Sequence, residues 1–129
     1  MRPSIRFLLL FLLVLGVTEA ASADALTLYT ATYVEVAPPS AAESADLLRQ
    51  YRAASRQDAG VLSVEVLQRI DRPNQFTILA SWTDQPALEA HAASAAAREL
   101  REKLRPLLAS PNDERRHQGL SVGPARAAV

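Results

Sequence analysis

The sequence contains no cysteine among its 129 residues, which excludes disulfides, thiolate metal sites, iron–sulfur clusters and cysteine nucleophiles. Basic charge is carried almost entirely by arginine, and Lys103 is the only lysine, which argues against Schiff-base chemistry. Charge of one sign is not in excess either, because 14 basic residues balance 14 acidic ones. A chain of this length and charge is typical of a single domain with no affinity for nucleic acid.

A long apolar run occurs only near the N-terminus. Arg2 and Arg6 precede the run at residues 7–17, and small residues follow at 21–23. This order is typical of a secretory signal peptide, so residues 1–23 are predicted to be a leader cleaved after Ala23. The mature protein would then be periplasmic or secreted, with no membrane contact. The alternative is an uncleaved membrane anchor, but eleven residues span only about 16 Å of a roughly 30 Å hydrocarbon core.

The first half of the mature chain predicts a strand followed by a helix. Residues 26–36 alternate, with Thr30, Thr32 and Val34 on one face and tyrosines on the other, which is typical of a strand. Ser40 to Glu43 has the form of a capping box, which predicts a helix over 41–58 that stops at Gly60.

The second half predicts a hairpin, a helix and a last strand. Residues 61–70 and 75–82 alternate on either side of a short polar turn, with Leu62, Val64, Val66 and Ile70 expected on one face. Thr83 or Asp84 is suited to cap one long second helix, which ends near Pro106. A short strand is expected at 115–122, and residues 123–129 are expected to form a disordered tail.

This β-α-β-β-α-β order predicts the ferredoxin-like α+β fold, in which two helices cover one face of an antiparallel sheet. The other face also carries apolar and aromatic side chains, among them Tyr29 and Tyr33. A second copy stacked sheet to sheet would cover that face, so a two-fold homodimer is expected.

The segment from Ser81 to His91 resembles the signature of the antibiotic biosynthesis monooxygenase family, which includes the small quinol monooxygenases. Trp82 and His91 match the motif W-x-x-x-x-x-L-x-x-H in this segment, and the likeness extends over residues 26–108. The resemblance implies that residues 24–122 form one dimeric α+β barrel domain, with a pocket between the sheet and the helices.

Two positions depart from the family pattern. Family members commonly carry a second histidine where this chain has Ala96, and the anthrone-oxidising members carry a polar amide where it has Ile78. Both changes replace a hydrogen-bonding group with hydrocarbon. They imply either a less polar substrate or the loss of catalysis.

The candidate site residues follow from the motif and from the strand faces. His91 is either a hydrogen-bonded core histidine or a base, because imidazole is suited to proton transfer near neutral pH. Trp82 is either a core anchor or a flat wall against an aromatic substrate. The site expected from the resemblance has His91 and Trp82 as catalytic residues, and its substrate-binding residues are Tyr29, Tyr33, Phe76 and Ile78. The tyrosines are equally compatible with a place in the dimer interface.

The function suggested by the resemblance is a monooxygenase that oxidises a quinol or polycyclic aromatic substrate with O₂. No cofactor is expected, because the chain has no glycine-rich nucleotide loop, and no metal is expected, because neither histidine has a carboxylate at ligand spacing. One alternative is a non-catalytic dimer that binds a small aromatic ligand. The other is a relative that binds or degrades haem, with His91 as the axial ligand.

Overall fold

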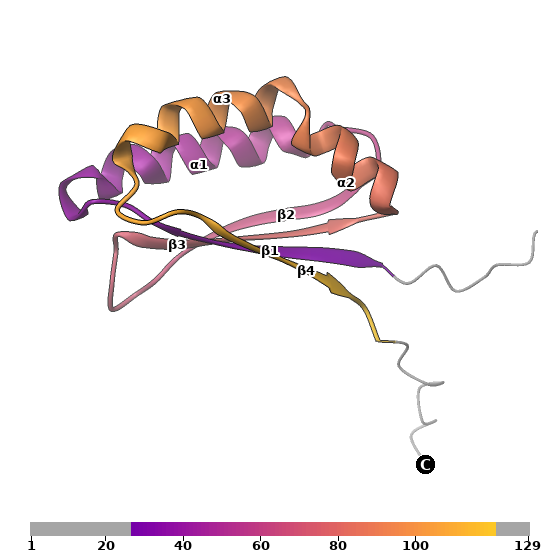
Figure 1. Cartoon of the computed structure of the whole chain (residues 1–129), viewed down its shortest axis with the longest axis horizontal. Coiled ribbons are helices and arrows are strands. Elements are labelled where there is room, and N and C mark those ends of the chain that lie inside the picture. The colour runs from indigo at the N-terminus through magenta and orange to yellow at the C-terminus, as the bar shows by residue number, and fades with distance from the viewer. Residues whose placement is uncertain (1–26, 121–129) are drawn as a thin grey trace, which may run out of the picture.

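The computed structural model describes residues 27–120 of the chain (Figure 1). The predicted signal peptide at 1–23 and the predicted tail at 123–129 lie outside these residues. Within the described part of the chain, no helix is both long enough and apolar enough to cross a membrane.

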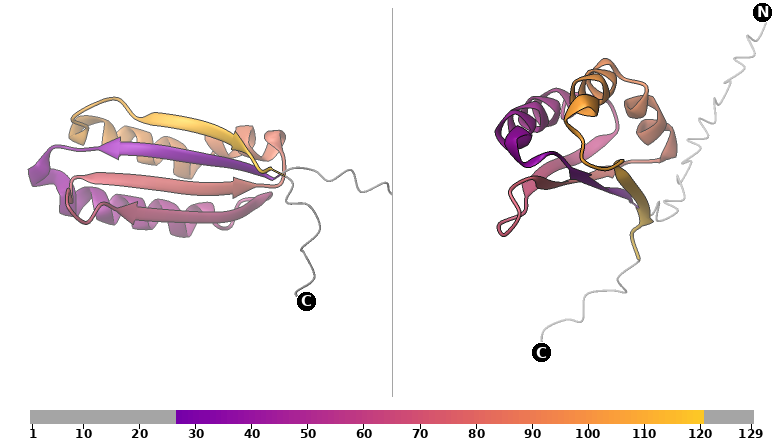
Figure 2. Two further views of the ribbon diagram at one scale, coloured as in Figure 1. Left: turned by 90° about the horizontal axis from the view of Figure 1, so that it is seen from below. Right: turned by 60° about the vertical axis from the view of Figure 1, so that its left-hand side comes forward.

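Four strands form one antiparallel sheet, and three helices pack on one of its faces (Figure 2). In chain order the elements are β1 (Leu28–Glu35), η1 (Pro38–Ser40), α1 (Ala41–Ser55), β2 (Val61–Gln68), β3 (Gln75–Trp82), α2 (Gln85–Ala92), α3 (Ala95–Leu104), η2 (Arg105–Leu107) and β4 (Asp113–Gln118). The strands lie in the order β2-β3-β1-β4, which is the predicted ferredoxin-like topology. The fold class read from the sequence is therefore confirmed.

The strand pairing puts the predicted residues on the helix-facing side of the sheet. Thr30 pairs with Ala80 and Val34 pairs with Phe76, so the even-numbered positions of β1 and β3 share one face. These side chains form the core with the helices, and its buried members are Val34, Val36, Leu48, Val64, Phe76, Ile78, Ala80, Trp82, Leu88 and Leu104. The opposite face of the sheet has no helix on it within residues 27–120.

The first helix begins as predicted but lacks the expected capping box. The Ser40 side chain makes no capping hydrogen bond, because its backbone, at φ −93° and ψ 5°, belongs to the turn η1 rather than to the extended conformation that an N-cap needs. The helix also ends earlier, at Ser55, and a turn leads from there to Gly60. Gly60 has a positive φ of 79°, in keeping with its predicted role as a stop.

The single second helix of the prediction is two helices. The backbone of Ser94 is extended, at φ −66° and ψ 159°, and its hydroxyl accepts a hydrogen bond from the amide of Ala97. A serine that can cap competes with the helical backbone, which divides the alanine-rich segment into α2 and α3. The predicted cap at the start of α2 is confirmed, because the Asp84 carboxylate accepts from the amide of Ala87.

The hairpin is confirmed, although β2 differs from its predicted pattern. The register of β2 against β3 shifts between Val61 and Ser63, so a bulge turns Leu62 outward. The strand ends at Gln68, which leaves Ile70 fully exposed in the turn. Leu62 and Ile70 therefore do not share the buried face of Val64.

β4 and β2 form the two edges of the sheet. β4 covers Asp113–Gln118 instead of 115–122 and is exposed along its length. At the other edge, Arg52 of α1 reaches β2, where its Nε donates to the carbonyl of Val64 and its guanidinium pairs with Glu65 at 3.1 Å.

Candidate functional site

The candidate site begins with His91, which lies in the last turn of α2. Asp84 and Pro86 set the start of this helix at the end of β3, and this puts His91 over the end of the sheet. The side chain is buried, with 4 % of its surface exposed. A buried imidazole needs partners for both ring nitrogens.

Both nitrogens of His91 have partners from the other half of the chain. Nδ1 lies 2.6 Å from Oδ2 of Asp58, in the turn after α1, and Nε2 lies 2.7 Å from the hydroxyl oxygen of Tyr51, within α1. A carboxylate accepts hydrogen bonds only, so Nδ1 donates its proton to Asp58. In the neutral ring Nε2 is then the acceptor, and the Tyr51 hydroxyl donates to it.

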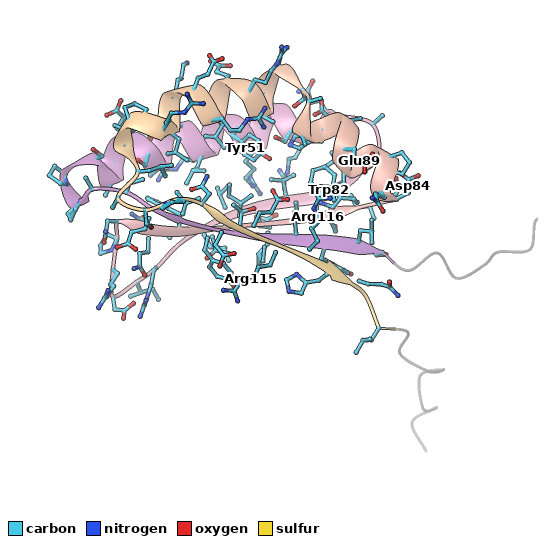
Figure 3. The ribbon with its side chains drawn as sticks, viewed as in Figure 1. Tyr51, Trp82, Asp84, Glu89, Arg115 and Arg116 are labelled. Carbon is cyan, nitrogen blue, oxygen red and sulfur yellow. The ribbon has the colours of Figure 1, made fainter. Side chains whose placement is uncertain are left out.

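Trp82 forms the wall beside this chain of hydrogen bonds. Its ring centroid lies 4.8 Å from that of His91, with the two planes inclined by 42°. Its indole Nε1 donates to the hydroxyl of Thr30 across 3.2 Å, which fixes the orientation of the ring. Figure 3 shows Trp82 and Tyr51 between the helices and the sheet.

These side chains border a cavity of about 220 Å³ between the sheet and the helices. Its sheet wall is formed by Thr30, Thr32, Ile78, Ala80 and Trp82, and its helix wall includes Tyr51, Leu88, His91, Ala97 and Leu100. Arg101, Asn112 and Glu114 give it one polar side. The cavity thus combines apolar walls with a few polar groups, as ligand sites usually do.

Burial raises the pKa of the Tyr51 hydroxyl above its ordinary value of 10.0. The Ser55 hydroxyl lowers this pKa in part, the negative charges of Glu114 and Asp58 raise it, and Arg101 opposes them. The hydroxyl is therefore neutral at neutral pH, and it can donate to His91 while its oxygen still accepts a second hydrogen bond.

The predicted site residues fall into three groups. His91, Trp82 and Ile78 line the same cavity. Phe76 is buried in the core, and it is not among the residues that line this cavity.

The two tyrosines of β1 lie elsewhere. Tyr29 and Tyr33 point from the opposite face of the sheet and are each 46 % exposed. Arg115 of β4 lies on that face too, with its guanidinium carbon 5.2 Å from the centroid of the Tyr33 ring (Figure 3).

The position of the missing family histidine is also separate from the cavity. Ala96 borders a groove between α1 and α3, with Leu47 and Leu100. The groove shares Tyr51 and Leu100 with the cavity, but Ala96 itself is not among the residues that line the cavity. Ile78, by contrast, is a wall residue, so its hydrocarbon side chain bears directly on what the cavity can hold.

Sequence reasoning did not find Tyr51 and Asp58 as site residues. Tyr51 has the spacing of a core residue of the first helix, and Asp58 has that of a solvent-facing residue at its end. Only the tertiary fold, in which α1 packs against α3 and α2 follows β3, brings them to His91.

Within residues 27–120 no three His, Cys, Asp or Glu side chains are grouped so that they could hold a metal ion. Direct ligation of a haem iron by His91 would displace either Tyr51 or Asp58 from its nitrogen. The cavity is also below the roughly 300–1,000 Å³ of typical ligand sites, and haem is a large ligand.

The fold and the motif agree with comparisons with known proteins. The sequence profile described as antibiotic biosynthesis monooxygenase matches residues 27–103, more than half of the chain. The chain therefore belongs to the antibiotic biosynthesis monooxygenase family. No protein with a curated functional description matches the sequence.

Solved structures show the same fold at low sequence identity. A protein from Pseudomonas aeruginosa is 24% identical, with a TM-score of 0.70 over 74% of this chain and 96% of its own. A protein described as an antibiotic biosynthesis monooxygenase is 17% identical, with a TM-score of 0.70 over 73% of this chain and 99% of its own. A Mycobacterium tuberculosis protein is 16% identical, with a TM-score of 0.70 over 76% and 99%.

Proposed function

We propose that the protein is a cofactor-independent monooxygenase that oxidises a small quinol with O₂. The observation that carries the proposal is the hydrogen-bonded chain Tyr51–His91–Asp58, centred on a buried imidazole, which ends at an apolar cavity walled by Trp82. Such a site offers a proton acceptor and a flat, dry surface. These are what a substrate that reacts with O₂ by itself requires of a protein.

The chemistry proposed for this site begins with loss of a proton from a substrate hydroxyl. The resulting anion is electron-rich enough to transfer an electron to O₂, and the two radicals combine at a ring carbon. One oxygen atom stays on the ring and the other leaves as water, so quinol and O₂ give a hydroxyquinone and water. O₂ is the only oxidant, and the quinol supplies all the electrons.

The size and lining of the cavity support a small substrate. Its volume of about 220 Å³ is below the roughly 300–1,000 Å³ typical of ligand sites, which favours one or two fused rings over a polycyclic anthrone. Ile78 and Leu88 offer only hydrocarbon next to the Trp82 ring. Polar substituents would therefore be directed toward Tyr51 or toward Arg101 and Asn112.

Oxygen uptake with a panel of reduced benzoquinols and naphthoquinols tests the proposal. We expect uptake that depends on the protein, produces a quinone and falls by roughly 10²–10⁴-fold in His91→Ala. The exposed His117 of β4 supplies the matched control, since His117→Ala should keep the wild-type rate. An unchanged rate in His91→Ala, or no uptake by the wild-type protein, would contradict the proposal.

Ile78 supports a second candidate, a dimer that binds a small aromatic ligand without reaction. At its position the anthrone-oxidising members are expected to hold a polar amide, and the isoleucine cannot donate a hydrogen bond to a developing negative charge. Saturable quenching of Trp82 fluorescence by the same quinols, without oxygen uptake or product, would establish this function instead.

We further propose that the mature chain is exported and works as a sheet-to-sheet homodimer. The face opposite the helices exposes Tyr29, Tyr33, Leu62, Leu67 and Leu79, and a second copy would bury them. Leu79→Lys, in the central strand β3, should give a monomer in sedimentation equilibrium, whereas Ile70→Lys in the hairpin turn should not. Detection of residues 1–23 on the exported protein by mass spectrometry would contradict cleavage after Ala23.

A further inference from the structure

We infer that the group that accepts the substrate proton is the hydroxyl of Tyr51, that His91 takes up the proton that Tyr51 gives up, and that Asp58 holds the imidazole in the tautomer that this transfer needs. The inference deepens the proposed function and rests on it. It makes Tyr51 the catalytic residue that touches substrate, while His91 relays the proton and Asp58 is a positioning residue.

The occupied nitrogens of His91 are the first reason. With Nδ1 at 2.6 Å from Asp58 and Nε2 at 2.7 Å from Tyr51, the imidazole has no free nitrogen to offer a substrate. Tyr51 borders the same cavity, and its oxygen keeps a lone pair after its proton is donated to His91. A substrate hydroxyl therefore meets Tyr51 before His91.

The role of Asp58 follows from the tautomer that it enforces. Its carboxylate holds the ring proton on Nδ1, so Nε2 is left as the acceptor toward Tyr51. The opposite tautomer would place a proton on Nε2 and would remove the only acceptor in the relay. The same carboxylate then faces the positive charge that His91 acquires when it takes the proton.

The proton steps balance without any further reactant. The substrate O–H bond breaks as a new O–H bond forms on Tyr51, and the original Tyr51 proton moves to Nε2 of His91. The products are a substrate anion, a neutral tyrosine and an imidazolium paired with Asp58. Because Tyr51 is neutral before and after the transfer, its raised pKa is compatible with this role.

The hydrogen-bonded chain ends at the protein surface. His91 is 4 % exposed, whereas the side chain of Asp58 is 35 % exposed, so the proton on the buried ring has one partner in contact with water. The other charged groups that act on this site are Arg101 of α3 and Glu114 of β4. They lie on the polar side of the cavity, and neither makes a hydrogen bond to a nitrogen of His91.

The first test is kinetic and uses the full-length mature protein with the most active reduced quinol. Tyr51→Phe should lower kcat by roughly 10²-fold or more, because it removes the acceptor oxygen and keeps the ring. Its control is Tyr33→Phe, on the opposite face of the sheet. A wild-type rate in Tyr51→Phe would overturn the inference and leave the proposed monooxygenase intact.

The second test reads the tautomer directly, in the resting protein and without substrate. The ¹⁵N chemical shifts of His91 should show a proton on Nδ1 in the wild type and in the exposed control Asp46→Asn. Asp58→Asn should lose this preference and should lower kcat more than it raises KM, and Asp58→Glu should restore both in part. A proton on Nε2 in the wild type would overturn the relay.

The two proposals fail in distinguishable ways. If the wild type consumes no O₂ with any quinol, the monooxygenase and the catalytic role of Tyr51 both fall. If the wild type does consume O₂ but Asp58→Asn keeps the wild-type rate and tautomer, only the proton relay from Tyr51 to His91 is contradicted.

Discussion

The indole nitrogen of Trp82 donates a hydrogen bond to the hydroxyl oxygen of Thr30, across 3.2 Å and between two buried side chains. We expect Thr30→Val, which keeps the shape of the side chain, to leave the indole N–H unpaired. The free energy of unfolding should fall by about 1–3 kcal/mol, the cost of a buried donor without an acceptor. Urea unfolding, monitored by the fluorescence of Trp82, measures this change in the free energy of unfolding.

Thr32→Val is the control for this substitution. Thr32 lies two residues further along β1, also borders the cavity, and makes no hydrogen bond to Trp82. Equal losses of stability in the two variants would show that the bond between Thr30 and Trp82 contributes nothing of its own.

Two serines that precede helices are expected to differ in their contribution to stability. Ser94 accepts a hydrogen bond from the amide of Ala97, whereas Ser40 makes no side-chain capping bond. Ser94→Ala should therefore cost about 0.5–2 kcal/mol. Ser40→Ala should stay within about 0.5 kcal/mol of the wild type, as surface substitutions usually do. Thermal unfolding of the two variants compares them, and a larger effect of Ser40→Ala would contradict the cap assignment.

Gly60 is expected to tolerate no side chain. Its φ is 79°, and a Cβ there would lie 2.4 Å from the Cβ of Ala87, in the first turn of α2. Gly60→Ala should cost at least about 2 kcal/mol through backbone strain and overpacking. Because α2 carries His91, the displacement should also weaken the contact with Tyr51 and lower any quinol turnover.

Gly119→Ala provides the comparison for Gly60. Its φ is not positive, and the nearest atoms to a new Cβ are at 3.3 Å, so its cost should be clearly smaller. Urea unfolding of both variants decides the order, and a reversed order would be incompatible with the packing of α2 on Gly60.

Burial raises the pKa of Tyr51 above 10.0, which has a consequence for stability at alkaline pH. A raised pKa means that the folded state holds the proton more tightly than the unfolded state does. The stabilisation is complete below pH 10.0 and is lost as the pH rises through the folded-state pKa. As the pH rises above 10.0, the wild type should lose more stability than Tyr51→Phe. Equal losses in urea unfolding would contradict this.

The fold could be predicted because its signals are local. Alternation in residues 26–36 and 75–82 predicted β1 and β3 and divided their side chains between two faces, and the motif containing Trp82 and His91 identified the family. The break between α2 and α3 was not predicted, because five of the six residues at 92–97 are alanines that favour a continuous helix. Ser94 alone does not offset their helix propensity when it is summed over the segment.

The site could be predicted only in part, because its contacts join residues that are far apart in the sequence. Tyr51 and His91 are 40 residues apart, and their contact depends on the position of α2 against α1, which no local pattern encodes. The placement of Tyr29 and Tyr33 shows the same limit. Strand alternation predicted that they share a face, but it could not tell which of the two faces borders the cavity.

The bond from Arg52 to the carbonyl of Val64 has a consequence for how the protein behaves in concentrated solution. β2 is an outer strand, and a free outer strand is a template on which another chain can add and begin a fibril. The Nε of Arg52 already occupies one main-chain acceptor of β2, the carbonyl of Val64. The charged side chains of Arg52, Arg56 and Glu65 lie at the same edge, and they would have to lose their hydration before another chain could pair with β2. One arginine thus helps to keep that margin of the sheet from aggregating.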